Sequence, residues 1–206
     1  MLNIALPKGR LGNKVYKLFD KIGYFCPEMA EDNRKLIFEN PKLQIRFFLV
    51  KPSDVAIYVE HGVADVGVVG KDILMETEPR IYELLDLKVG KCFMAVITPQ
   101  DYFEDPDKTL RVATKFVHVA KKYYASLNRE IEVIKLNGSI ELAPILGLSD
   151  VIVDIVETGT TARENNLKIY RKIADISARF IANPSSFKFK NGKIKDILDR
   201  LEEVTQ

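Results

Sequence analysis

The segment SDVIVDIVETGTTAREN, residues 149–165, places an apolar strand pattern directly before a loop of threonine and glycine. Residues 151–156 are β-branched except for Asp154, which is typical of a strand buried on both faces of a parallel sheet. After Glu157, residues 158–161 offer three hydroxyl groups, a run of backbone N–H donors and a glycine that allows a ligand to approach closely. The following residues are expected to begin a helix. A strand, a loop and a helix start in this order gather N–H donors in one place, and therefore predict a binding site for an anionic group.

An alternative is an ordinary turn between strand and helix, in which Thr160 or Thr161 only caps the helix. Asp154 and Glu157 argue against this alternative, because a carboxylate beside a phosphate-binding loop suits the binding of ribose hydroxyls or of a magnesium ion. The loop and its two carboxylates together predict a site for a sugar phosphate.

A second turn of this kind lies near the N-terminus. Residues 2–6 have the pattern of a short strand, and the turn around Lys8, Gly9 and Arg10 leads into a segment with helical spacing of apolar residues. Cations at the carboxyl end of a strand lie where open α/β sheets bind ligands, and a guanidinium can hold a phosphate through two hydrogen bonds. The alternative is a solvated basic turn. We favour binding because the chain contains two such turns.

Strand and helix patterns alternate along the rest of the chain, which indicates a parallel α/β sheet. Strands are expected at residues 34–38, 43–50, 64–70, 93–97, 110–113, 131–136 and 175–182. Helices are expected at residues 55–60, 115–127 and 194–204, and also from the cap at 137–139 through 146, with Glu141 in its first turn.

The composition argues against several classes of protein. The 206 residues contain 31 Lys and Arg against 29 Asp and Glu, and the net charge of +2 gives no reason to expect a nucleic acid partner. Cys26, Cys92, His61 and His118 lack the spacing of a metal site, so free thiols in a reducing compartment are expected. The N-terminus reaches Lys8 too early for a signal peptide, and no apolar run is long enough for a membrane span. We expect a soluble cytoplasmic protein that binds no membrane.

Five segments carry a resemblance to a known enzyme family. They are LPKGRL (6–11), RKLIF (34–38), KPSDVAIYVEHGVADVGVVGKDIL (51–74), NGSIELAP (137–144) and DIVETGTTARENN (154–166). In this order the sequence resembles the short form of ATP phosphoribosyltransferase over nearly the whole chain, and several ordered motifs are more specific than one glycine loop. The sequence departs from the family pattern at Ala162, where Leu is usual, and at Asn166, where Gly is usual. Asn tolerates the left-handed backbone, so the same turn is expected.

The resemblance implies an α/β fold with two lobes, like that of the type II periplasmic binding proteins, and a ligand cleft between the lobes. Lobe I would comprise residues 1–88 and 178–206, so that the last strand and helix return to the N-terminal lobe. Lobe II would comprise residues 89–177 and contain the phosphate-binding loop, residues 157–161. The turn at Gly9 and Arg10 would then face this loop across the cleft.

The resemblance also implies a reaction, in which N1 of the adenine of ATP is joined to the ribose of phosphoribosyl pyrophosphate and pyrophosphate is released. This is the first step of histidine biosynthesis. The leaving group needs cations and the reaction needs no protein nucleophile. The expected catalytic residues are Arg10 and Arg34, which would hold the pyrophosphate and the nucleotide phosphates, with Lys8 beside them. Mg²⁺ is the expected cofactor, carried by the pyrophosphate rather than by protein ligands.

The other expected site residues bind the two substrates. Asp154 and Glu157 would bind the ribose hydroxyls of phosphoribosyl pyrophosphate, directly or through water. The 5′-phosphate would be held by Thr158, Gly159, Thr160 and Thr161. Lys51 and Glu141 are candidates for the nucleotide pocket, although a carboxylate in the first turn of a helix, such as Glu141, is also favoured by the helix dipole alone.

The resemblance implies protein partners as well. The family's longer form carries a C-terminal regulatory domain, whereas this sequence ends at Gln206. The short form instead works with a separate regulatory subunit that resembles histidyl-tRNA synthetase. We therefore expect a homodimer joined to such a subunit in a hetero-oligomer, with ATP and phosphoribosyl pyrophosphate as substrates.

Two other functions stay open at this point. A phosphoribosyltransferase of the purine-salvage type also ends an apolar strand in acidic residues and a TGxT loop, but it normally has two adjacent acids, and here Asp154 is followed by Ile155. A non-catalytic ligand-binding module of the same fold would need an export signal or a DNA-binding segment, and the sequence shows neither.

Overall fold

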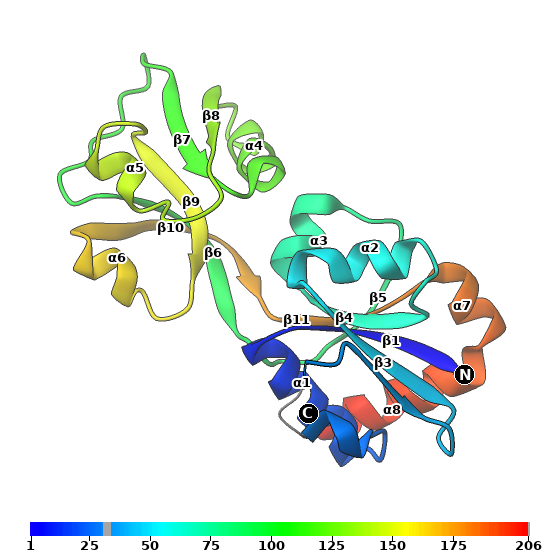
Figure 1. The fold of residues 1–206 in the computed structure, drawn as a ribbon. Helices are drawn as coiled ribbons and strands as arrows, with labels where there is room; N and C mark the ends of the chain where they lie inside the picture. The colour runs from blue at the N-terminus through cyan, green and yellow to red at the C-terminus, as the bar shows by residue number, and fades with distance from the viewer. Residues whose placement is uncertain (31–33, 206) are drawn as a thin grey trace. The chain divides into compact units, whose positions relative to one another are not determined.

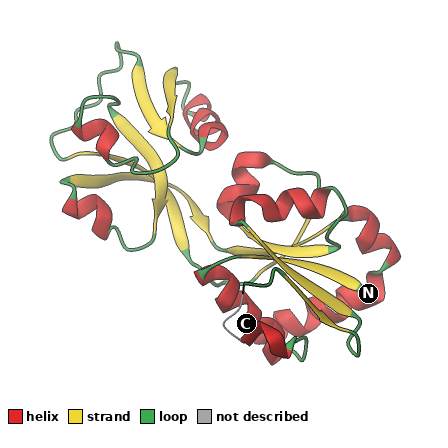
Figure 2. Ribbon diagram, in the orientation of Figure 1, coloured by secondary structure: helices red, strands yellow, loops and turns green. Residues whose placement is uncertain are grey.

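The computed structural model describes residues 1–30 and 34–205, and it forms two compact units (Figures 1 and 2). Unit 1 comprises Met1–Leu74, Glu78–Gly90 and Ser177–Gln206, and unit 2 comprises Met75–Thr77 and Lys91–Ile176. Each unit contains one β-sheet. Within the described part of the chain, no helix combines the length and the apolar composition that crossing a bilayer requires.

Unit 1 is built on a six-stranded sheet with the strand order β2-β3-β1-β4-β11-β5. Its strands are β1 (Leu2–Pro7), β2 (Ile37–Asn40), β3 (Ile45–Val50), β4 (Val66–Gly70), β5 (Tyr82–Asp86) and β11 (Ala178–Ala182). Its helices are α1 (Arg10–Lys21), α2 (Val55–Glu60), α7 (Pro184–Phe189) and α8 (Asn191–Thr205), with short 3₁₀ helices at Pro27–Ala30 and Pro52–Asp54. Helix α3 (Lys71–Thr77) begins in this unit.

Alternate side chains of β1 enter two different cores, because successive residues of a strand point to opposite faces of the sheet. Leu2, Ile4 and Leu6 are buried in a cluster with side chains of α1 and α8. Ala5 is buried in a second cluster with side chains of α2. Figure 1 shows α1 and α8 on one side of this sheet and α2 on the other. Since helices cover both faces, the ends of the strands are the places where this unit can present binding groups.

The last strand of the chain lies inside the sheet of unit 1. β11 pairs antiparallel with both β4 and β5 (Figure 1, orange among cyan strands). Asp65, directly before β4, is only 3% exposed. Its carboxylate accepts hydrogen bonds from the backbone N–H of Asn3 at 2.8 Å, from the hydroxyl of Ser186 at 2.7 Å and from Nζ of Lys190 at 2.7 Å. One buried carboxylate thus joins β1 to α7 and to Lys190, which lies between α7 and α8.

The substitution Asp65→Asn should destabilise the protein, because the amide keeps one acceptor oxygen for three donors and loses the charge opposite Lys190. We expect a loss of about 1–3 kcal/mol in the free energy of unfolding, measured by chemical denaturation. Asp199→Asn on the exposed face of α8 is the matched control and should change it by less than about 0.5 kcal/mol. Equal stability of the two variants would contradict the role given to Asp65.

Unit 2 is built on a five-stranded sheet with the order β10-β6-β9-β7-β8. Its strands are β6 (Cys92–Pro99), β7 (Leu110–Thr114), β8 (Ile131–Lys135), β9 (Val151–Val156) and β10 (Leu167–Ile176). Its helices are α4 (Val117–Ser126), α5 (Leu142–Ile145) and α6 (Thr160–Glu164). Val151 and Val153 of β9 pack with α4, whereas Ile152 packs on the opposite face with α5 and α6. By the same alternation, Asp154 lies on the face of α5 and α6.

The prediction of a parallel sheet is wrong, because both sheets are mixed. β1 is parallel to β3 and β4, but β2 and β11 run antiparallel to their neighbours. β9 is parallel to β7 and antiparallel to β6. A continuous apolar run reports burial on both faces of a strand, and it does not report the direction of the neighbouring strand.

The predicted strand at residues 175–182 is two strands that belong to different sheets. β10 ends at Ile176, Ser177 follows, and β11 begins at Ala178. Most of β10 was missed because its middle residues are polar or exposed and show no clear alternation. β5, whose first two residues are exposed, was also not predicted.

Two other predicted elements differ from the structure. The helix expected from residues 137–139 through 146 is only α5, and Glu141 is its N-cap rather than part of its first turn. Ser139 has a left-handed backbone, φ 48°, which a right-handed helix cannot include. The strand expected to open at Arg34 begins at Ile37, where pairing with Phe48 of β3 starts.

Candidate active site

The loop predicted to bind phosphate joins β9 to α6 as expected. Gly159 has φ 73°, a left-handed backbone that side chains other than glycine adopt with strain. A Cβ atom at this position would lie 3.3 Å from Nη1 of Arg163 and 3.3 Å from Cδ1 of Ile169. Ala162, the departure from the family pattern, is buried in the core beneath α6. The loop conformation therefore depends on the left-handed backbone of Gly159 and on the small buried side chain of Ala162.

The hydroxyl groups of the loop form a short network on the surface. Thr158 Oγ1 donates to Thr160 Oγ1 at 3.0 Å and accepts from the backbone N–H of Thr160 at 3.4 Å. Arg163, which the sequence reasoning missed, donates from Nη1 to the carbonyl of Thr158 at 3.2 Å and from Nη2 to Thr160 Oγ1 at 3.1 Å. Thr158, Thr160 and Thr161 are all exposed. The hydroxyls are thus ordered by neighbours and open to a ligand.

The two acidic residues lie where the sequence placed them, at the end of β9. Asp154 is half-buried within the strand, and its Oδ1 accepts from the backbone N–H of Ile155 at 2.8 Å. Glu157 is exposed directly after the strand. Both carboxylates are therefore next to the loop. Asp154 lies on the sheet face that carries α6, and Glu157 is the first residue after the strand.

Three parallel strands end at this edge of unit 2. β9 is parallel to β7, and β7 is parallel to β8, so their carboxyl ends meet at one edge of the sheet. The segment after β8 leads to Glu141, which is half-buried before α5. Lys115 follows β7, which lies between β8 and β9, and it is exposed with its Nζ 4.7 Å from the ring centre of Phe116. Sequence reasoning missed Lys115, although its place after a buried strand could have indicated it.

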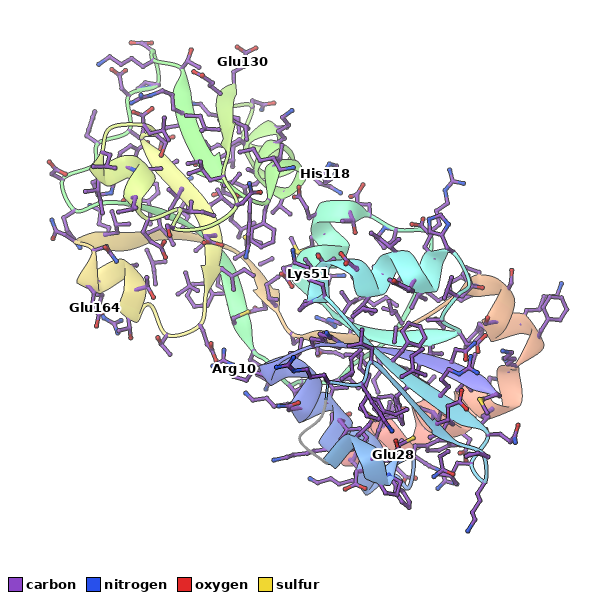
Figure 3. The ribbon with its side chains drawn as sticks, viewed as in Figure 1. Arg10, Glu28, Lys51, His118, Glu130 and Glu164 are labelled. Carbon is purple, nitrogen blue, oxygen red and sulfur yellow. The ribbon has the colours of Figure 1, made fainter. Side chains whose placement is uncertain are left out.

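Unit 1 gathers basic residues at the carboxyl ends of β1 and β3. Pro7 is in register with Val50, and the backbone N–H of Lys8 donates to the carbonyl of Val50 at 2.8 Å, so Lys8 and Lys51 follow neighbouring strands. Arg10 is the first residue of α1, and Figure 3 labels it together with Lys51.

Arg34 approaches the same edge from the other side of β3. The carbonyl of Leu36 accepts from the backbone N–H of Leu49 at 2.8 Å, and Arg34 precedes Leu36 by two residues. Lys8, Arg10, Arg34 and Lys51 are all exposed. Strand pairing thus brings together four cations that are spread over 44 residues of sequence, from Lys8 to Lys51.

The turn that carries Lys8 and Arg10 depends on a close approach of α1 to β1. A Cβ atom on Gly12 would lie 1.8 Å from the carbonyl oxygen of Pro7, which is a backbone atom that cannot move aside alone. Gly12 is buried in α1, so the first turn of this helix packs directly against the end of the strand.

Gly12→Ala should therefore destabilise the protein by about 1–3 kcal/mol and lower its activity, because the clash displaces the turn with Lys8 and Arg10. Gly192→Ala is the matched control, since Gly192 also lies in a helix, α8, and a Cβ atom there meets nothing within 4 Å. This control should be neutral or more stable by up to about 1 kcal/mol. Chemical denaturation of both variants decides the matter, and similar stability would contradict the close approach.

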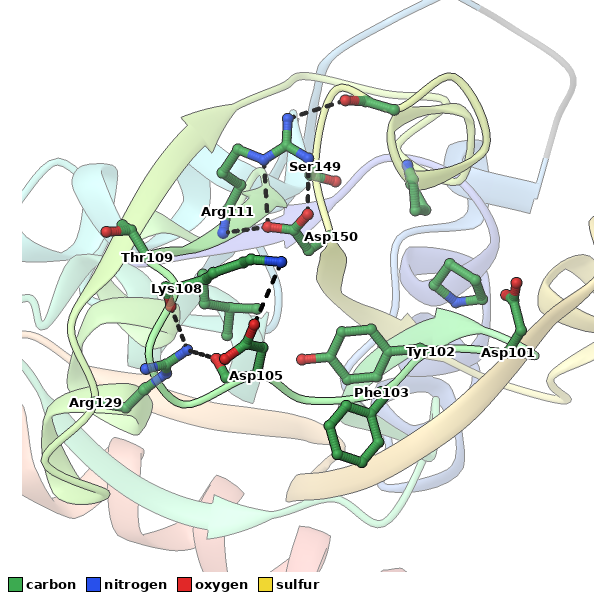
Figure 4. Close-up of a pocket in the computed structure, with 14 residues that line it drawn as sticks. Asp101, Tyr102, Phe103, Asp105, Lys108, Thr109, Arg111, Arg129, Ser149 and Asp150 are labelled. Carbon is green, nitrogen blue, oxygen red and sulfur yellow. Dashed lines mark hydrogen bonds and ion pairs between the residues drawn. The ribbon is translucent and has the colours of Figure 1, made fainter.

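A separate cavity of about 600 Å³ lies at the opposite edge of unit 2, where β7 and β9 begin (Figure 4). Four of its charged side chains form two ion pairs: Arg111 pairs with Asp150 at 2.7 Å, and Lys108 pairs with Asp105 at 3.3 Å. The hydrogen bond from Arg111 holds the pKa of Asp150 below its usual value. Arg129 donates to the backbone carbonyls of residues 105 and 108. This cavity contains none of the predicted site residues.

No metal site is built into the described residues. Among residues 1–30 and 34–205, no three His, Cys, Asp or Glu side chains are grouped so that they could hold a metal ion. Cys26 and Cys92 are not joined in a disulfide, and burial raises the pKa of Cys26 to about 11.

The model of a family described as ATP phosphoribosyltransferase matches residues 51–203. The chain belongs to this family. An ATP phosphoribosyltransferase of Brachyspira hyodysenteriae is 63% identical over 205 residues, which cover 99% of this chain and 100% of that protein. The predicted short form, the class of pentosyltransferase, the binding of ATP and the first step of histidine biosynthesis are confirmed.

Solved structures confirm the predicted fold class. The ATP phosphoribosyl transferase (HisG:HisZ) complex from Thermotoga maritima contains a chain with a TM-score of 0.86 and 39% identity, covering 100% of this chain and 98% of that chain. The probable amino-acid ABC transporter extracellular-binding protein ytmK from Bacillus subtilis has a TM-score of 0.57 at 14% identity, covering 98% of this chain and 90% of that chain. The second likeness concerns the fold alone, which is the α/β fold of periplasmic binding proteins.

Proposed function

We propose that the chain joins N1 of the adenine of ATP to C1 of the ribose of phosphoribosyl pyrophosphate, giving phosphoribosyl-ATP and pyrophosphate. The observation that carries this proposal is the exposed loop at residues 157–161, with three hydroxyls and a left-handed glycine at the carboxyl end of β9. Asp154 and Glu157 flank the loop, as a sugar phosphate requires, and the family membership supplies the reaction.

Each part of phosphoribosyl pyrophosphate has a proposed partner. The hydroxyls and backbone N–H groups of the loop hold the 5′-phosphate, because hydrogen-bond donors at a helix start suit an anion. Asp154 and Glu157 accept from the ribose hydroxyls, directly or through water. This assignment uses the half-buried carboxylate of Asp154 and the exposed carboxylate of Glu157 for the neutral ribose hydroxyls, and the loop hydroxyls for the charged phosphate.

The basic edge of unit 1 is proposed to serve the leaving group. When the bond from C1 to the pyrophosphate breaks, negative charge grows on the departing oxygen, and nearby guanidinium groups stabilise it. Arg10 and Arg34 take this role, with Lys8 beside them. Lys51, which follows the strand paired with that of Lys8, is proposed to contact the nucleotide phosphates. Glu141 is proposed for the nucleotide pocket.

Mg²⁺ fits this arrangement as a cation that the substrate brings. The chemistry of the residues agrees, because the described residues offer cations for phosphate and no group of three metal ligands. When bound to the pyrophosphate oxygens, the ion supplies further neutralisation of the charge that develops there.

We also propose the partners and the location. The chain works in the cytoplasm as a homodimer joined to a regulatory subunit that resembles histidyl-tRNA synthetase. Support comes from the likeness to a chain of the HisG:HisZ complex over nearly its whole length. Measurement of molecular mass with and without such a subunit tests the assembly, and a monomer in both samples would contradict it.

Nucleotide specificity tests the proposed reaction against purine salvage. The protein, with the regulatory subunit, is incubated with phosphoribosyl pyrophosphate, Mg²⁺ and either ATP or a free purine base. We expect pyrophosphate release with ATP and none with adenine, guanine or hypoxanthine. Release with a free base in place of ATP would overturn the proposal.

Replacing Arg10 or Arg34 by Ala should lower kcat more than it raises KM, because the contact strengthens as charge develops on the leaving group. We expect a loss in kcat on the order of 100-fold for each variant at saturating ATP and phosphoribosyl pyrophosphate. Arg80→Ala is the control, because Arg80 is an exposed arginine outside the basic edge, and it should keep the parent kcat. If both variants stay within about threefold of the parent, a small fraction of that loss, the assignment is wrong.

A further inference from the structure

Arg163 lies across the loop that is proposed to bind the 5′-phosphate. It comes from α6, is exposed, and reaches back over Gly159 to the residues on either side of this glycine. Nη1 donates to the carbonyl of Thr158 at 3.2 Å, and Nη2 donates to Thr160 Oγ1 at 3.1 Å. The guanidinium fits there because position 159 has no Cβ atom, which would lie 3.3 Å from Nη1.

The contact with Thr160 determines what its hydroxyl can do. A threonine hydroxyl has two lone pairs and one proton. Thr160 Oγ1 accepts one hydrogen bond from Thr158 Oγ1 at 3.0 Å and a second from Arg163 at 3.1 Å. Both lone pairs are then in use, so the proton is the remaining group that this hydroxyl can offer to a ligand.

The Thr158 hydroxyl is oriented toward the Thr160 hydroxyl. Its oxygen accepts from the backbone N–H of Thr160 at 3.4 Å, which leaves its proton to be donated to Thr160 Oγ1. Arg163 has only donors, so it occupies one lone pair of Thr160 Oγ1 and the Thr158 hydroxyl occupies the other. With both bonds in place, the proton of Thr160 is directed away from these two neighbours and toward a ligand.

We propose that Arg163 is a positioning residue that holds the Thr160 hydroxyl as a hydrogen-bond donor toward the 5′-phosphate. This inference rests on the proposed function of the loop, and goes beyond it by naming the residue that prepares the loop for an anion. A donor oriented before binding costs less reorganisation when the ligand arrives, so the gain appears in binding. Arg163 acts through Thr160, rather than by its charge alone.

A double-mutant cycle tests this route of action. The four proteins are the parent, Arg163→Met, Thr160→Val and the double variant, each titrated with phosphoribosyl pyrophosphate and Mg²⁺ by calorimetry, with kcat and KM measured in parallel. We expect each single variant to raise the dissociation constant about tenfold, as loss of a hydrogen bond to a charged group does. The double variant should match Thr160→Val within about twofold, because Thr160→Val already lacks the hydroxyl through which Arg163 acts. We expect kcat/KM to fall in step with the loss of binding in all three variants, because the contact with the 5′-phosphate is already made in the bound ground state.

Two results would overturn the inference. If the double variant multiplies the two single effects to about 100-fold, Arg163 acts independently of Thr160. If Arg163→Met stays within about twofold of the parent, far less than the expected loss, Arg163 does not prepare the loop. Should Arg163→Met fail to fold, as its melting temperature would tell, Arg163→Gln takes its place in the cycle. Arg80→Met, the same change at an exposed arginine of unit 1, should leave the dissociation constant unchanged.

Thr161→Val separates this inference from the function on which it rests. If Thr160→Val and Thr161→Val both weaken binding while Arg163→Met does not, the loop binds phosphate and only the role of Arg163 is wrong. If neither threonine variant weakens binding, the loop is not the phosphate site, and both proposals fall.

Discussion

The pairing of β11 between β4 and β5 is the constraint on which unit 1 depends. Residues 178–182 form the strand that pairs with β5 and joins it to the sheet. The other five strands of this sheet all come from residues 2–86. Asp65 reinforces this closure, because its buried carboxylate accepts from the backbone of β1, from Ser186 of α7 and from Lys190 between α7 and α8. A carboxylate that is 3% exposed tolerates burial only when its charge is matched, and Lys190 matches it. The ends of the chain are therefore held to each other through the middle of the sheet.

The two sets of candidate site residues both lie at the carboxyl ends of strands. The basic edge exists because β1 and β3 run parallel in register, so that Lys8 and Lys51 leave the sheet side by side. The loop proposed to bind phosphate follows β9, whose first three residues and Val156 are buried, and Gly159 then turns the chain into α6. In both units the core determines where a strand stops, and the polar residues that follow are the candidate site residues.

Local features were predictable from the sequence, whereas pairing was not. The strand, loop and helix around Gly159 were predicted because periodicity and glycine act over a few residues, and α2 was predicted at Val55–Glu60 for the same reason. Strand direction, the polar strand β10 and the position of Arg34 at the same sheet edge as Lys51 depend on partners distant in sequence. Arg163 was not predicted, because the sequence does not distinguish an arginine that bonds back to its loop from a solvated arginine on a helix. Ordered motifs supplied the family, which no single local pattern could have done.

The late position of β11 has a consequence for the protein as it leaves the ribosome. Unit 2 comprises residues 75–77 and 91–176, so it is synthesised before β11, the strand that completes the sheet of unit 1. Until residue 182 has emerged, β4 has a bare edge of Val and Gly, VGVVG, with unpaired backbone groups of the kind that recruit strands from other chains. A truncated translation product that stops before Ala178 keeps this edge permanently. Such products would be aggregation-prone substrates for chaperones and proteases, whereas the finished chain covers the edge with its own last strand.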